Sequence, residues 1–248
     1  MITGCLTAVA ASYYSGSVWI GMLAAAIVSG LFGLIFGVLA IEFRVNQVVL
    51  GVAFNLVGAG LTTTLNRAFF NGLVIKAHFA QDPLGFTVPI YIAILLVILM
   101  WFFLQKTKLG IQIRAVGENP IVVESVGISV KKLRYAACIA GGILSGIGGA
   151  YLSTGLLSEF TESMTEGRGF IALAAVTFGK YGPFGTLGGV AVFGLGEMLS
   201  YRLQVMEGSF PYEFALMLPY VLTILALCIF SRNGHDPTSL GVPYKKNR

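Results

Sequence analysis

The chain is divided into long apolar stretches separated by short polar turns and loops. The clearest, Val18–Ile41, carries no charged side chain and is longer than the roughly 20 residues that a helix needs to cross a bilayer. Two others, Ile2–Tyr14 and Phe170–Phe178, are too short to cross comfortably. We expect the first to be part of a span and the second to be a crossing rather than a re-entrant half-helix. The remaining predicted spans are Val48–Leu65, Thr87–Leu104, Tyr135–Leu157, Gly185–Tyr201 and Phe214–Phe230.

The composition agrees with a membrane protein. The chain is 56% hydrophobic and 11% charged, whereas soluble domains are about 25% charged. The fold class predicted is therefore all-α, a polytopic integral membrane protein with about 7–8 transmembrane helices in one bundle, surrounded by membrane lipid. The net charge of +5 does not indicate a nucleic-acid partner, because the cations gather in particular loops and in the tail.

One polar interruption, Lys106–Arg134, holds six of the 16 Lys and Arg residues. Inside it, Asn119 is a favourable N-cap and Pro120 suits the first position of a helix. Gly127 can take the left-handed conformation that ends one. The pattern predicts a helix from Pro120 to Val126 of about seven residues, roughly 10 Å long. A rigid helix this short cannot bury a core of its own, so we expect it to contact another molecule.

The distribution of cations predicts the orientation. If the basic loop is cytoplasmic and each apolar stretch crosses once, 12 of the 16 cations lie on the cytoplasmic side, as the positive-inside rule requires. The predicted organisation is a transmembrane domain, residues 1–231, with a cytoplasmic loop at 105–134, followed by a cytoplasmic C-terminal tail at 232–248. The loop Ser158–Arg168, with its three glutamates, is then external.

Polar residues along the third apolar stretch recur on one helical face, at spacings of three or four residues. Polar groups in a span face the bundle interior. They therefore either bond to a neighbouring helix or line the path of a polar, uncharged solute, since amides and hydroxyls suit ribose and base edges better than an ion. The stripe is Gly51, Asn55, Gly58, Thr62 and Asn66.

Glycine is abundant, with 32 residues. Small residues four apart occur within the spans, and such spacing lets helix backbones approach closely. The pattern indicates either tight helix packing or room for helices to slide or for solute to pass. The pairs are Gly33 with Gly37, Gly142 with Gly146, and Ser145 with Gly149.

Several segments resemble the permease subunits of bacterial ABC importers for simple sugars and nucleosides. They are RAVGENP at 114–120, ESVGI at 124–128 and TEGRGFIALAA at 165–175, and the similarity runs from about Gly4 to the last span. The segment NQVVLG at 46–51, with Asn55, is most similar to the branched, nucleoside-type group that works with BMP-type solute-binding lipoproteins. Family members usually begin with one or two further spans before the equivalent of Gly4.

The resemblance implies a permease subunit in the bacterial cytoplasmic membrane that translocates a nucleoside or simple sugar. It implies three partners: an ABC ATP-binding subunit, a second permease that is identical or related, and an extracytoplasmic solute-binding lipoprotein. It also implies that the segment 117–127 is a coupling helix that docks in a groove of the ATPase subunit. The residues assigned to coupling are Arg114, Gly117, Glu118, Asn119, Pro120, Glu124 and Gly127, and those assigned to the solute path are Asn55, Thr62 and Asn66.

Other function classes fit the residues less well. The chain has no G-x-x-x-x-G-K-[ST] loop for ATP, so no ATPase activity of its own is expected. An intramembrane enzyme needs a nucleophile–base pair or metal ligands at membrane depth. The two histidines instead lie in a loop and in the tail, and the three cysteines show no metal or disulfide spacing. We therefore expect no catalytic residue, metal or cofactor.

The remaining alternative is a secondary transporter or channel for a small polar solute. It would need an inverted repeat or coupling-ion carboxylates near the midplane, and the sequence shows neither. Glu197 is the one acidic residue inside a predicted span, near its outer end, where Arg202 is a candidate partner.

Overall fold

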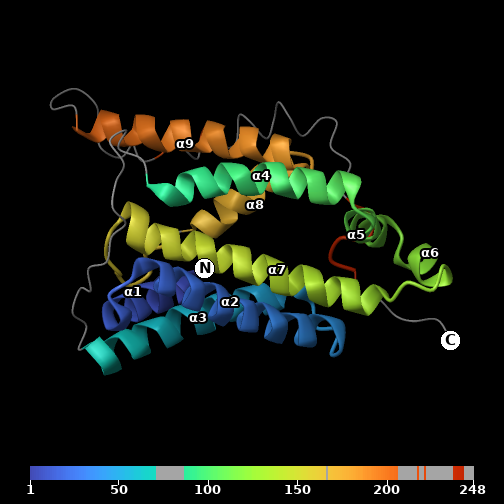
Figure 1. The fold of residues 1–248 in the computed structure, drawn as a ribbon, viewed down its shortest axis with the longest axis horizontal. Coiled ribbons are helices and arrows are strands. Elements are labelled where there is room, and N and C mark those ends of the chain that lie inside the picture. Colours follow the sequence, from blue (N-terminus) through green and yellow to red (C-terminus); the bar gives the residue numbers. More distant parts are fainter. Residues whose placement is uncertain (71–86, 166, 206–216, 218–220, 222–236, 243–248) are drawn as a thin grey trace. The chain divides into compact units, whose positions relative to one another are not determined.

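The computed structural model describes residues 1–70, 87–165, 167–205, 217, 221 and 237–242, which fold mainly into helices (Figure 1). The predicted all-α class is confirmed for this part of the chain. In order, the elements are α1 (Ile2–Ser15), α2 (Val18–Ile41), α3 (Gln47–Phe70), α4 (Val88–Lys106), α5 (Lys108–Glu118), α6 (Pro120–Ser125), α7 (Val130–Tyr151), the π-helical turn η1 (Leu152–Leu156), α8 (Arg168–Phe178) and α9 (Pro183–Val205).

Four of the described helices are long and apolar enough to cross a membrane: α2, α3, α4, and α7 continued through η1 to Leu156. The chain is therefore a multi-pass membrane protein. α8 is apolar but shorter, and α9 covers the predicted span Gly185–Tyr201. The predicted span Phe214–Phe230 lies outside the described residues, and the total of about 7–8 spans stays a prediction.

The closest packing in the described chain is between α2 and α7, which lie side by side in Figure 1. Glycines make it possible. A Cβ atom at Gly142 would lie 2.5 Å from the carbonyl oxygen of Ser29 and 3.0 Å from the Cα of Gly33. One at Gly146 would lie 2.6 Å from the carbonyl oxygen of Ala25. These glycines therefore serve tight helix packing, the first of the two readings of the sequence pattern.

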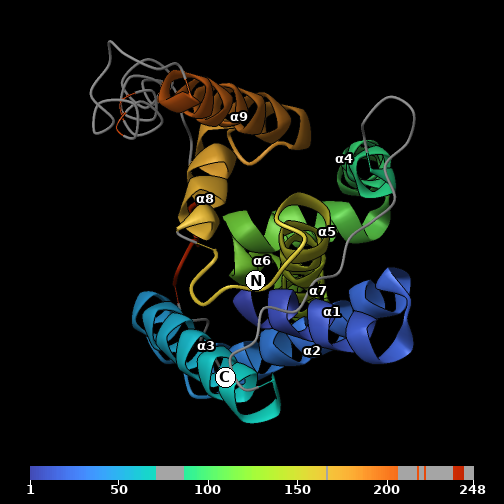
Figure 2. The same cartoon turned by 90° about the vertical axis from the view of Figure 1, so that its left-hand side faces the viewer.

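A smaller group of helices packs separately from this core. Contacts within the described chain divide it into one compact unit of residues 1–94, 106–166 and 238–248, and another of residues 95–105 and 167–237. In the second unit α8 contacts α9 (Figure 2), with the rings of Phe178 and Phe193 centred 5.5 Å apart. Arg168 also donates to a Glu197 carboxylate oxygen at 2.9 Å. Arg168 is thus the partner of Glu197, whereas the sequence had suggested Arg202.

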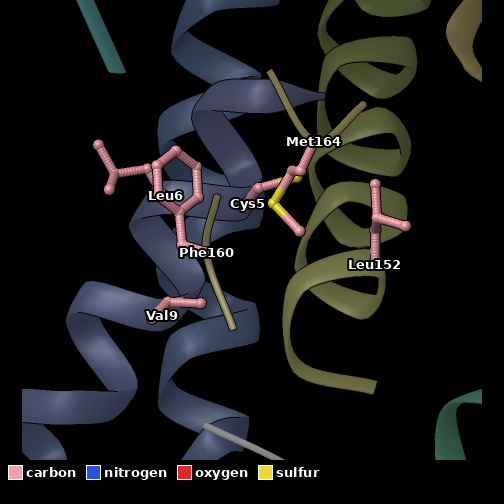
Figure 3. Close-up of a cluster of buried hydrophobic side chains, with 6 residues drawn as sticks. All are labelled: Cys5, Leu6, Val9, Leu152, Phe160 and Met164. Carbon is pink, nitrogen blue, oxygen red and sulfur yellow. The ribbon is translucent and has the colours of Figure 1, made fainter. Parts of the chain in front are cut away.

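A buried apolar cluster lies within the first unit (Figure 3). It joins three residues of α1 with the turn that follows α7 and the loop beyond it. The turn is also tied to α1 by a hydrogen bond, in which the buried hydroxyl of Ser153 donates to the carbonyl oxygen of Cys5 at 3.1 Å. The cluster is made of Cys5, Leu6, Val9, Leu152, Phe160 and Met164.

Candidate functional site

The basic loop between α4 and α7 is mostly helical. Its first part is α5, which the sequence reasoning did not predict. α5 begins at Thr107, whose hydroxyl oxygen accepts from the backbone N–H of Gly110 at 3.1 Å. A threonine at this place is a standard N-cap, and this was the signal that could have revealed the helix.

The second part of the loop is α6, and its two ends are formed as predicted. The Asn119 side-chain oxygen accepts from the N–H groups of Ile121 at 3.2 Å and Val122 at 3.3 Å, and Pro120 occupies the first turn. At the other end Gly127 has a φ of 84°. The helix has six residues, Pro120–Ser125, and is therefore slightly shorter than expected.

The end of α6 is a Schellman motif. The N–H of Gly127 donates to the carbonyl oxygen of Glu124 at 2.9 Å, and that of Ile128 donates to the carbonyl oxygen of Val123 at 3.3 Å. Such an arrangement requires a left-handed residue at the position of Gly127 and is accompanied by an apolar contact between the residues in the places of Ile128 and Val123. Both features are present here.

An apolar cluster fixes α6 to its two neighbours. Val116 of α5, Val123 of α6 and Val130 of α7 are all buried and pack together, with Ala115, Ile128 and Leu133 around them. Although α6 is too short to have a core, it shares one with the helices on either side. Its direction is therefore set by α5 and α7.

Apolar side chains of α6 and of its C-cap residue are exposed on the side away from this cluster. Ile121, Val122 and Val126 are 61%, 56% and 72% exposed. These side chains lie outside the four candidate spans, so the lipid interior does not account for them. Exposed apolar groups gathered on a rigid element are typical of a protein contact surface.

The charged residues assigned to coupling lie around this element. Arg114 and Glu118 are exposed on α5, and Glu124 is partly exposed on α6. Close by, the Lys131 ammonium group donates to both carboxylate oxygens of Glu42 at 3.0 and 2.8 Å. This exposed pair joins the start of α7 to the end of α2, although an exposed ion pair contributes less than about 1 kcal/mol.

The polar stripe on α3 is divided by α1. Gly58 faces α1, since a Cβ atom there would lie 3.3 Å from the Cγ2 of Ile2. Thr62 and Asn66 are 1% and 4% exposed, whereas Asn55 is exposed. The Thr62 hydroxyl bonds to its own helix, to the carbonyl oxygens of Gly58 at 2.8 Å and Ala59 at 3.0 Å.

Asn66 lies on helix rather than in the following loop, because α3 continues to Phe70. Within the part of the chain that the structure describes, its buried side-chain oxygen has no hydrogen-bond partner. The adjacent Arg67 forms a two-pronged ion pair with Glu162, at 3.0 and 3.1 Å. The structure thus buries Thr62 and Asn66 and leaves Asn55 on the exposed part of the stripe.

The family match and the similar proteins found by comparison all concern permease components of transport systems. Residues 1–227 match the family described as "Branched-chain amino acid transport system / permease component". The guanosine ABC transporter permease protein NupQ of Bacillus subtilis (strain 168) is 35% identical, over 100% of this chain and 86% of the relative. The nucleoside ABC transporter permease protein NupC of Lactococcus lactis subsp. cremoris (strain MG1363) is 31% identical, over 93% of this chain and 78% of the relative.

A third relative is the putative glucose ABC transporter permease protein TsgC13 of Haloferax volcanii, 32% identical over 84% of this chain and 68% of the relative. No solved structure matches the chain. The helices define a multi-pass membrane protein whose loop between α4 and α7 forms a rigid helical module. The match over residues 1–227 shows that the chain belongs to this family of transport-system permease components.

Proposed function

We propose that the chain is the permease subunit of an ABC importer in the bacterial cytoplasmic membrane and that its solute is a nucleoside. Two relatives aligned over nearly the whole chain are named as guanosine and nucleoside permeases. The observation that carries the mechanism is α6, which is fixed to α5 and α7 by the cluster around Val123 and presents an apolar outer face. A separate ATP-binding subunit would supply the energy through this face.

The remaining partners follow from the same assignment. An extracytoplasmic lipoprotein would deliver the nucleoside, and a second permease, identical or related, would complete the central path. The basic loop and the C-terminal tail would be cytoplasmic, because this places 12 of 16 cations inside. Labelling of a cysteine at Lys132 by an impermeant reagent applied outside intact cells would contradict this orientation.

Nucleoside uptake is expected to depend on ATP and not on the proton gradient. In cells that express the complete importer, depletion of ATP should abolish uptake of labelled guanosine, and collapse of the proton gradient alone should leave it. Excess unlabelled nucleoside should compete with the label, whereas excess glucose should not. Uptake that follows the proton gradient would instead indicate a secondary transporter.

The solute path is proposed to run along the polar face of α3, with Asn55 as its accessible amide. In the described arrangement Thr62 and Asn66 are buried whereas Asn55 is exposed, so Asn55 is the residue of choice for a test. We expect Asn55→Leu to weaken nucleoside uptake while leaving the amount of permease in the membrane unchanged. Loss of one hydrogen bond to a desolvated polar solute costs about 1–3 kcal/mol, which is roughly a fivefold or larger effect.

The matched control is Val57→Leu on another face of the same helix, where the side chain is 57% exposed. Uptake by Val57→Leu should equal that of the wild type. If Asn55→Leu transports at the wild-type rate, the stripe serves helix packing only.

A further inference from the structure

A short segment of the C-terminal tail, Thr238–Val242, is bound to the end of α5. The backbone N–H of Ser239 donates to the carbonyl oxygen of Gly117 at 3.0 Å. The hydroxyl groups of Thr238 and Ser239 both donate to the carbonyl oxygen of Glu118, the latter at 3.2 Å. In Figure 1 this segment, in red, lies beside α5.

The break between α5 and α6 leaves the carbonyl groups of Gly117 and Glu118 without N–H donors from their own helix. In a continuous helix, Gly117 and Glu118 would accept from the N–H groups of Ile121 and Val122, four residues further on. Here the side-chain oxygen of Asn119, the N-cap of α6, accepts from both of those N–H groups. The tail supplies the missing donors to these two carbonyl groups. At the joint between α5 and α6, the N–H groups are therefore bonded by Asn119 and the carbonyl groups by the tail.

The same segment is also anchored to α7. The guanidinium group of Arg134 donates to the carbonyl oxygen of Val242 at 3.0 Å. The segment therefore connects the end of α5 with the start of α7, the two helices between which α6 is held. Its hydrogen bonds span sequence separations from 108 residues, between Arg134 and Val242, to 122 residues, between Gly117 and Ser239, so no local signal of the loop requires them.

We propose that Thr238–Val242 is a strap that sets the direction in which α6 leaves α5, and that this strap is a positioning element of the coupling apparatus. The proposal rests on the proposed function, since it assigns the strap to the same contact with the ATP-binding subunit. Without the strap, two helix-terminal carbonyl groups turn to water and the joint at Glu118 and Asn119 gains freedom. The ATPase subunit then receives a weaker signal from the transmembrane helices.

The test compares two shortened chains in the complete complex, reconstituted with its ATP-binding subunit and receptor. A chain that ends at Pro237 lacks the strap, whereas a chain that ends at Val242 keeps the strap and loses only the residues beyond it. The first loses the strap's four hydrogen bonds to the carbonyl groups of Gly117 and Glu118 and to Arg134, and should show about tenfold lower maximal ATP hydrolysis in the presence of nucleoside-loaded receptor, which corresponds to about 1.4 kcal/mol. The second should match the wild type.

Point variants separate positioning from a loss of folding. Ser239→Pro removes the N–H that bonds to Gly117, and we expect it to behave as the chain that ends at Pro237. Ser239→Thr keeps both the N–H and a hydroxyl group, and we expect it to retain full stimulation. The amount of complex, its basal ATP hydrolysis and the receptor concentration for half-maximal stimulation should stay constant, because only the maximal stimulated rate depends on the direction of α6.

A Gly127→Val variant measured in parallel distinguishes the possible failures. If Gly127→Val loses stimulation while the chain ending at Pro237 and Ser239→Pro both keep it, the strap has no role in coupling and the proposed function stands. If all three variants keep stimulation, α6 itself is not the coupling element. If Ser239→Pro lowers complex amount and basal hydrolysis in the same proportion as stimulation, the segment serves folding and the proposal is wrong.

Discussion

Replacing Gly127 by valine is expected to abolish stimulation of ATP hydrolysis by nucleoside-loaded receptor, with insertion into the membrane unchanged. Gly127 has a φ of 84° and its N–H closes the last turn of α6. A left-handed conformation costs an L-residue about 1–2 kcal/mol, and more when it is β-branched. The chain would relieve this strain by turning out of the left-handed region, which breaks the Schellman motif and releases Ile128 from Val123.

The position is suited to a clean experiment because, among the described residues, no heavy atom beyond the two chain neighbours lies within 4 Å of a Cβ built on Gly127. The effect of a substitution is therefore one of backbone conformation and not of side-chain crowding. Asparagine tolerates the left-handed region, so Gly127→Asn is the matched control and should retain most of the stimulation. The measurement is ATP hydrolysis by the reconstituted complex with and without receptor and nucleoside. Full stimulation in Gly127→Val would remove α6 from the coupling mechanism.

The second large effect is expected at the contact between α2 and α7. A Cβ atom at Gly142 would collide with the backbone of Ser29 and Gly33, which belong to a helix and cannot move independently. We expect Gly142→Val to separate the two helices and to destabilise the protein by about 1–3 kcal/mol or more, the usual cost of overpacking. The measurement is the melting temperature of the purified permease in detergent, followed by the loss of its monodisperse elution peak.

The neighbouring glycine provides the control. Gly141 is exposed, and no atom lies within 4 Å of a Cβ built there. Gly141→Val carries the same small gain in helix propensity without the collision, so its melting temperature should not fall below that of the wild type. Equal melting temperatures for the two variants would show that the close approach of α2 and α7 is not needed for stability.

The sequence by itself determined the features that depend on a few adjacent residues. Hydropathy identified the four described helices that are long and apolar enough to cross a membrane, because the cost of burying a charge in lipid is read from composition alone. Asn119, Pro120 and Gly127 predicted both ends of α6, because a cap and a left-handed terminus act on backbone groups within about four residues. The same kind of signal was present at Thr107 for α5. The sequence prediction assigned only one helix to this polar loop, and the structure adds α5.

Only the tertiary structure decided which of these elements meet. The spacing of Gly142 and Gly146 indicated a close contact but did not name α2 as the partner. Neither the burial of Thr62 and Asn66 nor the bonding of Ser239 to Gly117 has a local signal. The physical reason is that a hydrogen-bond donor or a small residue specifies what kind of partner it needs. Which partner it obtains depends on how distant segments of the whole chain pack.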